Sequence, residues 1–139
     1  MHRNFDGVTL LWSQFATNGA NTHTLQGHPD AAKQVAADEK EAFIDLHAMS
    51  QQMYKAVGPA DLHLLFSYAN GKQDGTHNND FGSHEISKLV LEGVRQNKLD
   101  LVSHIRDDVS VFDPSKPDKP GEFKFPFSSK WDGTRPPGD

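Results

Sequence analysis

The chain has 139 residues, with 14 Lys and Arg against 19 Asp and Glu, and its formal net charge is −5 when the histidines are neutral. This acidic balance, without a basic cluster, argues against nucleic acid as a partner, and no apolar run approaches the roughly 20 residues that span a bilayer. Because there are no cysteines, a disulfide framework, a thiolate zinc site and a cysteine nucleophile are excluded.

Two compositional regions divide the chain. Residues 1–106 alternate short apolar runs with helix-like periodicity, which is typical of α/β organisation. Residues 107–139 hold most of the 8 prolines and are predicted to form an extended tail.

The first predicted helix begins at Pro29, a residue that suits the first helical position, and ends near Glu39 or Lys40. The apolar run at residues 42–46 has the length of a strand and is predicted to be one. We interpret the carboxylate of Asp45 as a cap for the element that follows and not as a catalytic group.

A second helix is predicted after this strand, because apolar side chains recur there at helical spacing until Gly58 and Pro59 end the pattern. The order of helix, strand and helix is typical of a crossover unit in a parallel sheet. Further strands of that sheet are expected near Val8 and Leu62.

The clearest helix is predicted over residues 80–96. Asn79 or Asp80 can cap it by accepting a hydrogen bond from a backbone N–H of the first turn. Its apolar stripe, which is expected to face the core, consists of Ile86, Leu89, Val90 and Val94.

Aromatic residues give the tail its predicted role. Phe123, Phe125 and Phe127 occupy every second position, so one face of an extended segment is aromatic. We expect this face, with Trp131, to dock on the first region and not to form a core of its own.

A polar segment at residues 71–80 contains an acid and an imidazole three residues apart and is expected to be a loop. If the chain turns at Gly75, the Asp74 carboxylate can accept a hydrogen bond from Nδ1 of His77, and Nε2 of His77 can then take a proton. That arrangement gives the orienter and general base of a hydrolytic triad. Spacing alone favours a turn followed by a helix cap, because Asp and Gly are common turn residues.

The 8 histidines lack the spacing of a metal site. His77 and His84 are seven residues apart, which can place both on one helix face, but there is no His-Glu-x-x-His pattern. We therefore expect no metal ion and no other cofactor, and we interpret the histidines as surface or capping residues.

Several blocks of the sequence resemble a known enzyme family. The Asp74-Gly75-Thr76-His77 block, with Asn78-Asn79-Asp80-Phe81-Gly82 after it, resembles the last block of the SGNH (GDSL-type) hydrolases. Upstream segments are similar to one branch of that family, the rhamnogalacturonan acetylesterases; these are Asn21-Thr22-His23, Pro29-Asp30-Ala31, Val35-Ala36, Phe43-Ile44-Asp45-Leu46-His47-Ala48-Met49-Ser50 and Tyr54-Lys55-Ala56-Val57-Gly58-Pro59. The resemblance covers residues 2 to about 106 and implies the C-terminal part of a flavodoxin-like three-layer SGNH hydrolase fold.

The resemblance also implies a chemistry. In that family the Asp-x-x-His block supplies two members of a Ser-His-Asp triad, which makes Asp74 the orienter and His77 the general base. The implied reaction is removal of O-acetyl groups from a pectin-like polysaccharide or oligosaccharide through an acyl-enzyme. Cell-wall substrates of this kind favour an extracellular or periplasmic parent enzyme.

The nucleophile of the family is missing from this sequence. No serine lies in a Gly-Asp-Ser motif or a Gly-x-Ser-x-Gly elbow, and Ser83, the nearest imitation, falls within the helix predicted after His77. We therefore expect a C-terminal portion of an enzyme that is inactive alone. It is also expected to be poorly stable until the N-terminal half is supplied, because its helices would expose apolar stripes.

A second interpretation is not catalytic. The chain would then be a small carbohydrate-binding or interaction module, in which Asp74 and His77 are simply loop residues. A Gly-Asp-Ser segment encoded in frame upstream of Met1 would separate the two interpretations.

Overall fold

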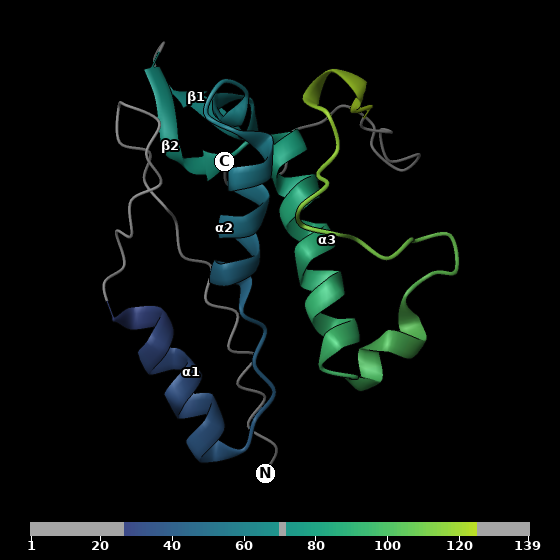
Figure 1. The fold of residues 1–139 in the computed structure, drawn as a ribbon. Coiled ribbons are helices and arrows are strands. Elements are labelled where there is room, and N and C mark those ends of the chain that lie inside the picture. Colours follow the sequence, from purple (N-terminus) through teal and green to yellow (C-terminus); the bar gives the residue numbers. More distant parts are fainter. Residues whose placement is uncertain (1–26, 70–71, 125–139) are drawn as a thin grey trace, which may run out of the picture.

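The computed structural model describes residues 27–69 and 72–124, which form a mixed α/β structure. The described residues form the α-helices α1 (His28–Glu39), α2 (Leu46–Val57) and α3 (Asp80–Gln96) and a hairpin of β1 (Phe66–Ala69) and β2 (Lys72–Asn78), which are labelled in Figure 1. The 3₁₀ helix η1 (Leu62–Leu65) leads into β1, and two further 3₁₀ helices, η2 (Asp100–His104) and η3 (Pro120–Glu122), follow α3. Among the described helices, none combines the length and the apolar character that a bilayer span requires.

Helix α1 confirms the first predicted helix. Pro29 lies in its first turn, and the helix ends where Lys40 adopts a left-handed conformation with φ 57°. In Figure 1 this helix lies apart from α3, and its apolar Val35 is 61% exposed.

The strand predicted at residues 42–46 is wrong. Residues 41–45 have no regular secondary structure, and α2 already begins at Leu46. The Asp45 carboxylate accepts a hydrogen bond from the Ala48 N–H at 2.9 Å, so the predicted cap is confirmed and the helix starts inside the apolar run. An apolar run of this length is compatible with either a buried strand or a buried helix start, and the cap decides between them here.

Helices α2 and α3 pack against each other and supply much of the core. Leu46 and Met53 of α2 and Leu89 and Val94 of α3 are buried. The extended residue Ile44 crosses α3 at Gly93, where an added Cβ would lie 2.3 Å from Ile44 Cγ2. The helix predicted over residues 80–96 is therefore confirmed, including the inward position of its apolar stripe.

The sheet within the described residues is antiparallel and has two strands, β1 and β2. Phe66 pairs with Asn78, Tyr68 with Gln73 and Ala69 with Lys72. The strand expected near Leu62 begins four residues later, after the η1 turn, and the strand expected near Val8 lies outside the described residues. The flavodoxin-like three-layer fold accordingly stays a prediction.

The segment after η2 runs back along α3. Phe112 is buried in the core, and the ring of Phe123 lies 5.3 Å from that of Phe81 and 5.1 Å from that of His84. The part of the tail up to Phe123 thus docks on the helical region, whereas Phe125, Phe127 and Trp131 lie outside the described residues. The division of the chain at residue 106 stays a prediction.

Candidate functional site

Asp74 and His77 lie on a strand and not on the expected loop. Residues 72–78 form β2, which pairs with β1 and leads directly into α3. The loop prediction is wrong for residues 72–78, because Lys72, Gln73 and Asn78 pair with residues of the apolar segment at 66–69. Their cross-strand partners were not recognisable from local composition.

The pairing of β2 is interrupted at these two residues. Between the Phe66–Asn78 pair and the Tyr68–Gln73 pair, Ser67 alone stands opposite residues 74–77. The extra residues on β2 bulge out of the ladder, and such irregularities redirect side chains and are frequent beside active sites. The side chain of His77 is exposed, and the side chain of Asp74 lies outside the described part of the structure.

The end of this bulge is fixed by hydrogen bonds from three directions. Ser67 Oγ donates to the Asn78 carbonyl at 3.0 Å, and the Asn79 N–H donates to the Leu65 carbonyl at 3.1 Å. The Asn79 side chain caps α3 by accepting from the Gly82 N–H at 2.9 Å, so Asn79 is the cap of the two candidates that the sequence offered. The chain therefore leaves the bulge along a defined path.

Close backbone contact reinforces this junction. Gly82, in the first turn of α3, is buried, and an added Cβ there would lie 2.1 Å from the Leu65 carbonyl oxygen. Only glycine lets the first turn of α3 approach η1 this closely. The start of α3 and the end of η1 thus act as one support for the residues just before α3.

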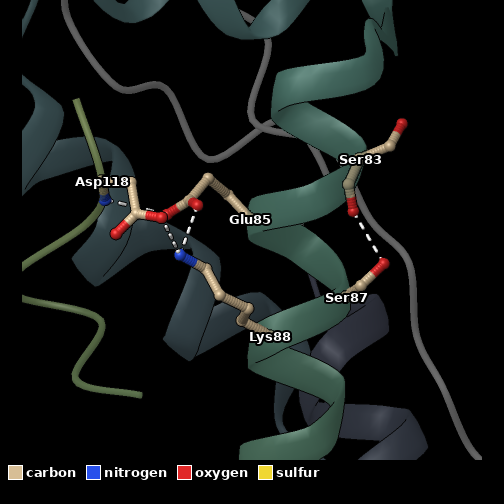
Figure 2. A network of polar contacts seen from close by, with 5 residues as sticks. All are labelled: Ser83, Glu85, Ser87, Lys88 and Asp118. Atoms are coloured by element: carbon tan, nitrogen blue, oxygen red, sulfur yellow. Dashed lines mark hydrogen bonds and ion pairs between the residues drawn. The ribbon is translucent and has the colours of Figure 1, made fainter. Parts of the chain in front are cut away.

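An ion cluster around the buried Glu85 lies farther along α3, as Figure 2 shows. Glu85 is fully buried, and the Lys88 ammonium is 2.5 Å from Glu85 Oε1 and 2.9 Å from Asp118 Oδ2. The Asp118 N–H also donates to Glu85 Oε2 at 3.2 Å. Lys88 lies in addition 4.4 Å from the centre of the Phe112 ring. The cluster ties the segment after η2 to α3.

The two carboxylates and a neighbouring histidine are of the residue types that bind metal ions. One potential ligand atom each from His84, Glu85 and Asp118 lies within 4.8 Å of the others. Lys88 already gives both carboxylates a cationic partner without a metal ion. We interpret it as a structural contact.

Two curated proteins are similar to this chain. It is 36% identical over 101 residues to rhamnogalacturonan acetylesterase RhgT of Bacillus subtilis (strain 168), covering 66% of this chain and 44% of RhgT. It is 31% identical over 88 residues to the probable rhamnogalacturonan acetylesterase YesY of the same organism, covering 63% of this chain and 41% of YesY. The chain is a homologue of rhamnogalacturonan acetylesterases.

The family resemblance stated from the motifs is confirmed by these relatives. The chain spans less than half the length of each of the two rhamnogalacturonan acetylesterases. No family model and no solved structure matches it.

Ser83 has the structural position that the sequence suggested. It lies in the first turn of α3, and its carbonyl accepts a hydrogen bond from Ser87 Oγ at 2.8 Å. Figure 2 shows both serines on the side of α3 away from Glu85 and Asp118. These contacts do not involve Asp74 or His77.

Two features near residues 74–77 were missed from the sequence. The contacts of Asn79 with η1 and β1 join residues that are distant in sequence, so no local pattern indicates them. Glu85 and Lys88 have the spacing of a helical ion pair, which was a visible signal, but the third member, Asp118, comes from the tail.

Proposed function

We propose that this chain supplies two members of the Ser-His-Asp triad of a carbohydrate acetylesterase. In this proposal Asp74 holds the His77 imidazole in one tautomer through Nδ1, and His77 Nε2 acts as the general base. The proposal rests on homology to rhamnogalacturonan acetylesterases together with an Asp-x-x-His block located at a strand irregularity directly before a helix.

The proposed reaction needs a serine from another segment. The serine hydroxyl attacks the acetyl carbonyl while His77 takes its proton, and His77 then returns that proton to the departing sugar hydroxyl. His77 next removes a proton from water, which attacks the acetyl-enzyme and releases acetate and the free serine. The net reaction converts an acetylated sugar and water into the sugar alcohol and acetate.

We propose that the substrate is an acetylated, pectin-like polysaccharide or oligosaccharide, because RhgT is named for rhamnogalacturonan. The chain corresponds in this proposal to the C-terminal portion of the SGNH fold, and the oxyanion hole comes with the missing N-terminal half. Without a nucleophile to activate, the 139-residue chain is expected to be inactive.

Complementation tests this function. The chain is fused after the part of RhgT that the sequence match leaves uncovered, and acetate release from acetylated rhamnogalacturonan is measured. We expect activity from the fusion and none from the chain alone. His77→Ala should reduce kcat/KM of the fusion by about 10³-fold or more, and Asp74→Asn by about 10²-fold or more.

His104→Ala is the matched control, because His104 is an exposed histidine at the end of η2. Its activity should equal that of the unchanged fusion. Equal activity of the His77→Ala variant would refute the assigned role. A folded fusion without any esterase activity would favour the binding-module interpretation, and polysaccharide binding by the 139-residue chain would support that alternative directly.

A further inference from the structure

Asn79, two residues after the proposed base, makes several hydrogen bonds through its side chain. Its Nδ2 donates to the Leu64 carbonyl at 2.7 Å and to the Phe66 carbonyl at 3.3 Å. Its Oδ1 accepts from the Gly82 N–H at 2.9 Å. One amide side chain therefore joins η1, β1 and the first turn of α3, which is more than a helix cap requires.

The main chain of Asn79 adds two further bonds. Its N–H donates to the Leu65 carbonyl at 3.1 Å, and its carbonyl accepts from the Ser83 N–H at 2.8 Å. Asn79 is thus held on both its backbone and its side chain. Such a residue fixes the direction in which the chain enters α3.

This fixed point lies two residues after His77. Residues 74–77 bulge out of the ladder, and the next paired residue toward α3 is Asn78, opposite Phe66. The backbone of His77 is consequently located from its C-terminal side by Asn78 and Asn79. A change at Asn79 should therefore affect the backbone position of His77 more than that of residues farther back along β2.

We propose that Asn79 is a positioning residue that fixes the conformation of His77 through the two Nδ2 hydrogen bonds. The catalytic consequence of this inference rests on the proposed function of His77, whereas the conformational consequence does not. Because a misplacement of about 1 Å can cost about 100-fold in rate, the effect on catalysis should exceed the effect on folding.

Asn79→Asp separates the two roles of the side chain. Aspartate caps a helix as well as asparagine does, since an oxygen still accepts from the Gly82 N–H, but both donors to Leu64 and Phe66 are lost. Asn79→Ser also keeps an oxygen that can cap the helix and also removes the amide donors, but it adds no charge. Asp45→Ala removes the cap of α2 instead and serves as the matched control for lost helix stability.

The first measurement uses the whole 139-residue chain labelled with ¹⁵N and ¹³C. Three-bond couplings to the Hβ protons of His77 report whether its side chain keeps one χ1 rotamer or averages over several. We expect one rotamer in the unchanged chain and in Asp45→Ala, and averaged couplings in Asn79→Asp and Asn79→Ser. Averaging in the unchanged chain, or one rotamer in both Asn79 variants, would overturn the proposal. Global unfolding of both Asn79 variants, seen by circular dichroism, would also overturn it, because Asn79 would then be purely structural.

The second measurement uses the esterase fusion described above. Asn79→Asp should lower kcat by about 10- to 100-fold while KM for the acetylated polysaccharide stays within about twofold. Asp45→Ala should leave both constants unchanged at a temperature where the fusion is folded. Full activity of His77→Ala would refute the proposed function and leave the rotamer result valid, whereas full kcat of Asn79→Asp in an enzyme that depends on His77 would refute the positioning role alone.

Discussion

Helix α3 and the strand β2 that leads into it are neighbours in sequence but differ in how they are specified. The helix carries a cap at Asn79, an apolar stripe and the Glu85–Lys88 ion pair, all of which form between residues at most four positions apart or recur at helical spacing. Strand β2 is mostly polar and is paired with β1 through an irregular register. The proposed catalytic residues therefore lie where local sequence constrains the backbone less than it does in α3, and their geometry depends on the better specified helix.

The largest loss of stability is expected from a change in the ion cluster on α3. Lys88→Met keeps an unbranched side chain without the ammonium group and leaves the buried Glu85 carboxylate without its cation. We expect a loss of about 3–5 kcal/mol in the free energy of unfolding, because an unpaired buried charge is poorly tolerated. Urea denaturation measures the loss, and cleavage by chymotrypsin at Phe112 should become faster as the docked segment is released.

The matched control for this variant is Lys116→Met. Lys116 lies 3.4 Å from Asp113, and both side chains are largely exposed, at 81% and 48%. An exposed pair contributes at most about 1 kcal/mol. Equal losses for the two lysine variants would mean that the cluster on α3 is no stronger than a surface ion pair.

The contact between α3 and η1 gives the next largest expected effect. Gly82→Ala places a methyl group against the Leu65 carbonyl, a backbone atom that cannot move aside by a side-chain rotation. We expect a loss of about 3 kcal/mol, at the upper end of what overpacking costs. Gly121→Ala is the control because nothing lies within 4 Å of the position of its added Cβ. Melting curves of the two variants should therefore diverge, and coincident curves would contradict the close approach.

Elements defined by nearby residues could be predicted from the sequence, and elements defined by distant partners could not. The three helices follow from spacing, caps and breakers such as Pro29 and Gly58, all of which act within one or two turns. The strand predicted at residues 42–46 failed because an apolar run alone does not define its partner, and the Asp45 cap begins a helix instead. The block at residues 74–77 and the upstream blocks together indicated the family, but the place of residues 74–77 in a bulged hairpin depends on Phe66 and Tyr68, which no local pattern connects to them.

The contact between α2 and the hairpin should make the stability of the chain depend on pH. Tyr54 of α2 packs on Phe66 of β1 with the ring centres 5.9 Å apart, and burial raises the pKa of Tyr54 from 10.0 to about 12. The unfolded chain therefore loses the Tyr54 proton at lower pH than the folded chain does. The contribution of Tyr54 to the free energy of unfolding is fully present below pH 10 and is lost as the pH rises from 10 to 12.

Tyr54→Phe should remove about 2–3 kcal/mol of this alkaline loss, as judged from urea midpoints at pH 9 and near pH 12. Tyr68→Phe is the control, because Tyr68 is 64% exposed on the same hairpin. If Tyr68→Phe flattened the alkaline decline as much as Tyr54→Phe, burial of Tyr54 would not be its cause.

The smallest expected effect on stability tests the bulge most directly. Ser67→Ala removes the hydrogen bond from Ser67 Oγ to the Asn78 carbonyl, which should cost about 1 kcal/mol of global stability. Ser103→Ala removes a comparable bond to the Asp100 carbonyl at 2.8 Å in η2, far along the chain from β2. Amide hydrogen exchange should separate the two variants: Ser67→Ala should accelerate exchange in residues 74–78, and Ser103→Ala should not. Because the ladder is already interrupted opposite Ser67, a small global loss should concentrate in the strand segment that carries His77. Uniform acceleration over the whole chain would instead mean that β2 and α3 open together and do not differ in local stability.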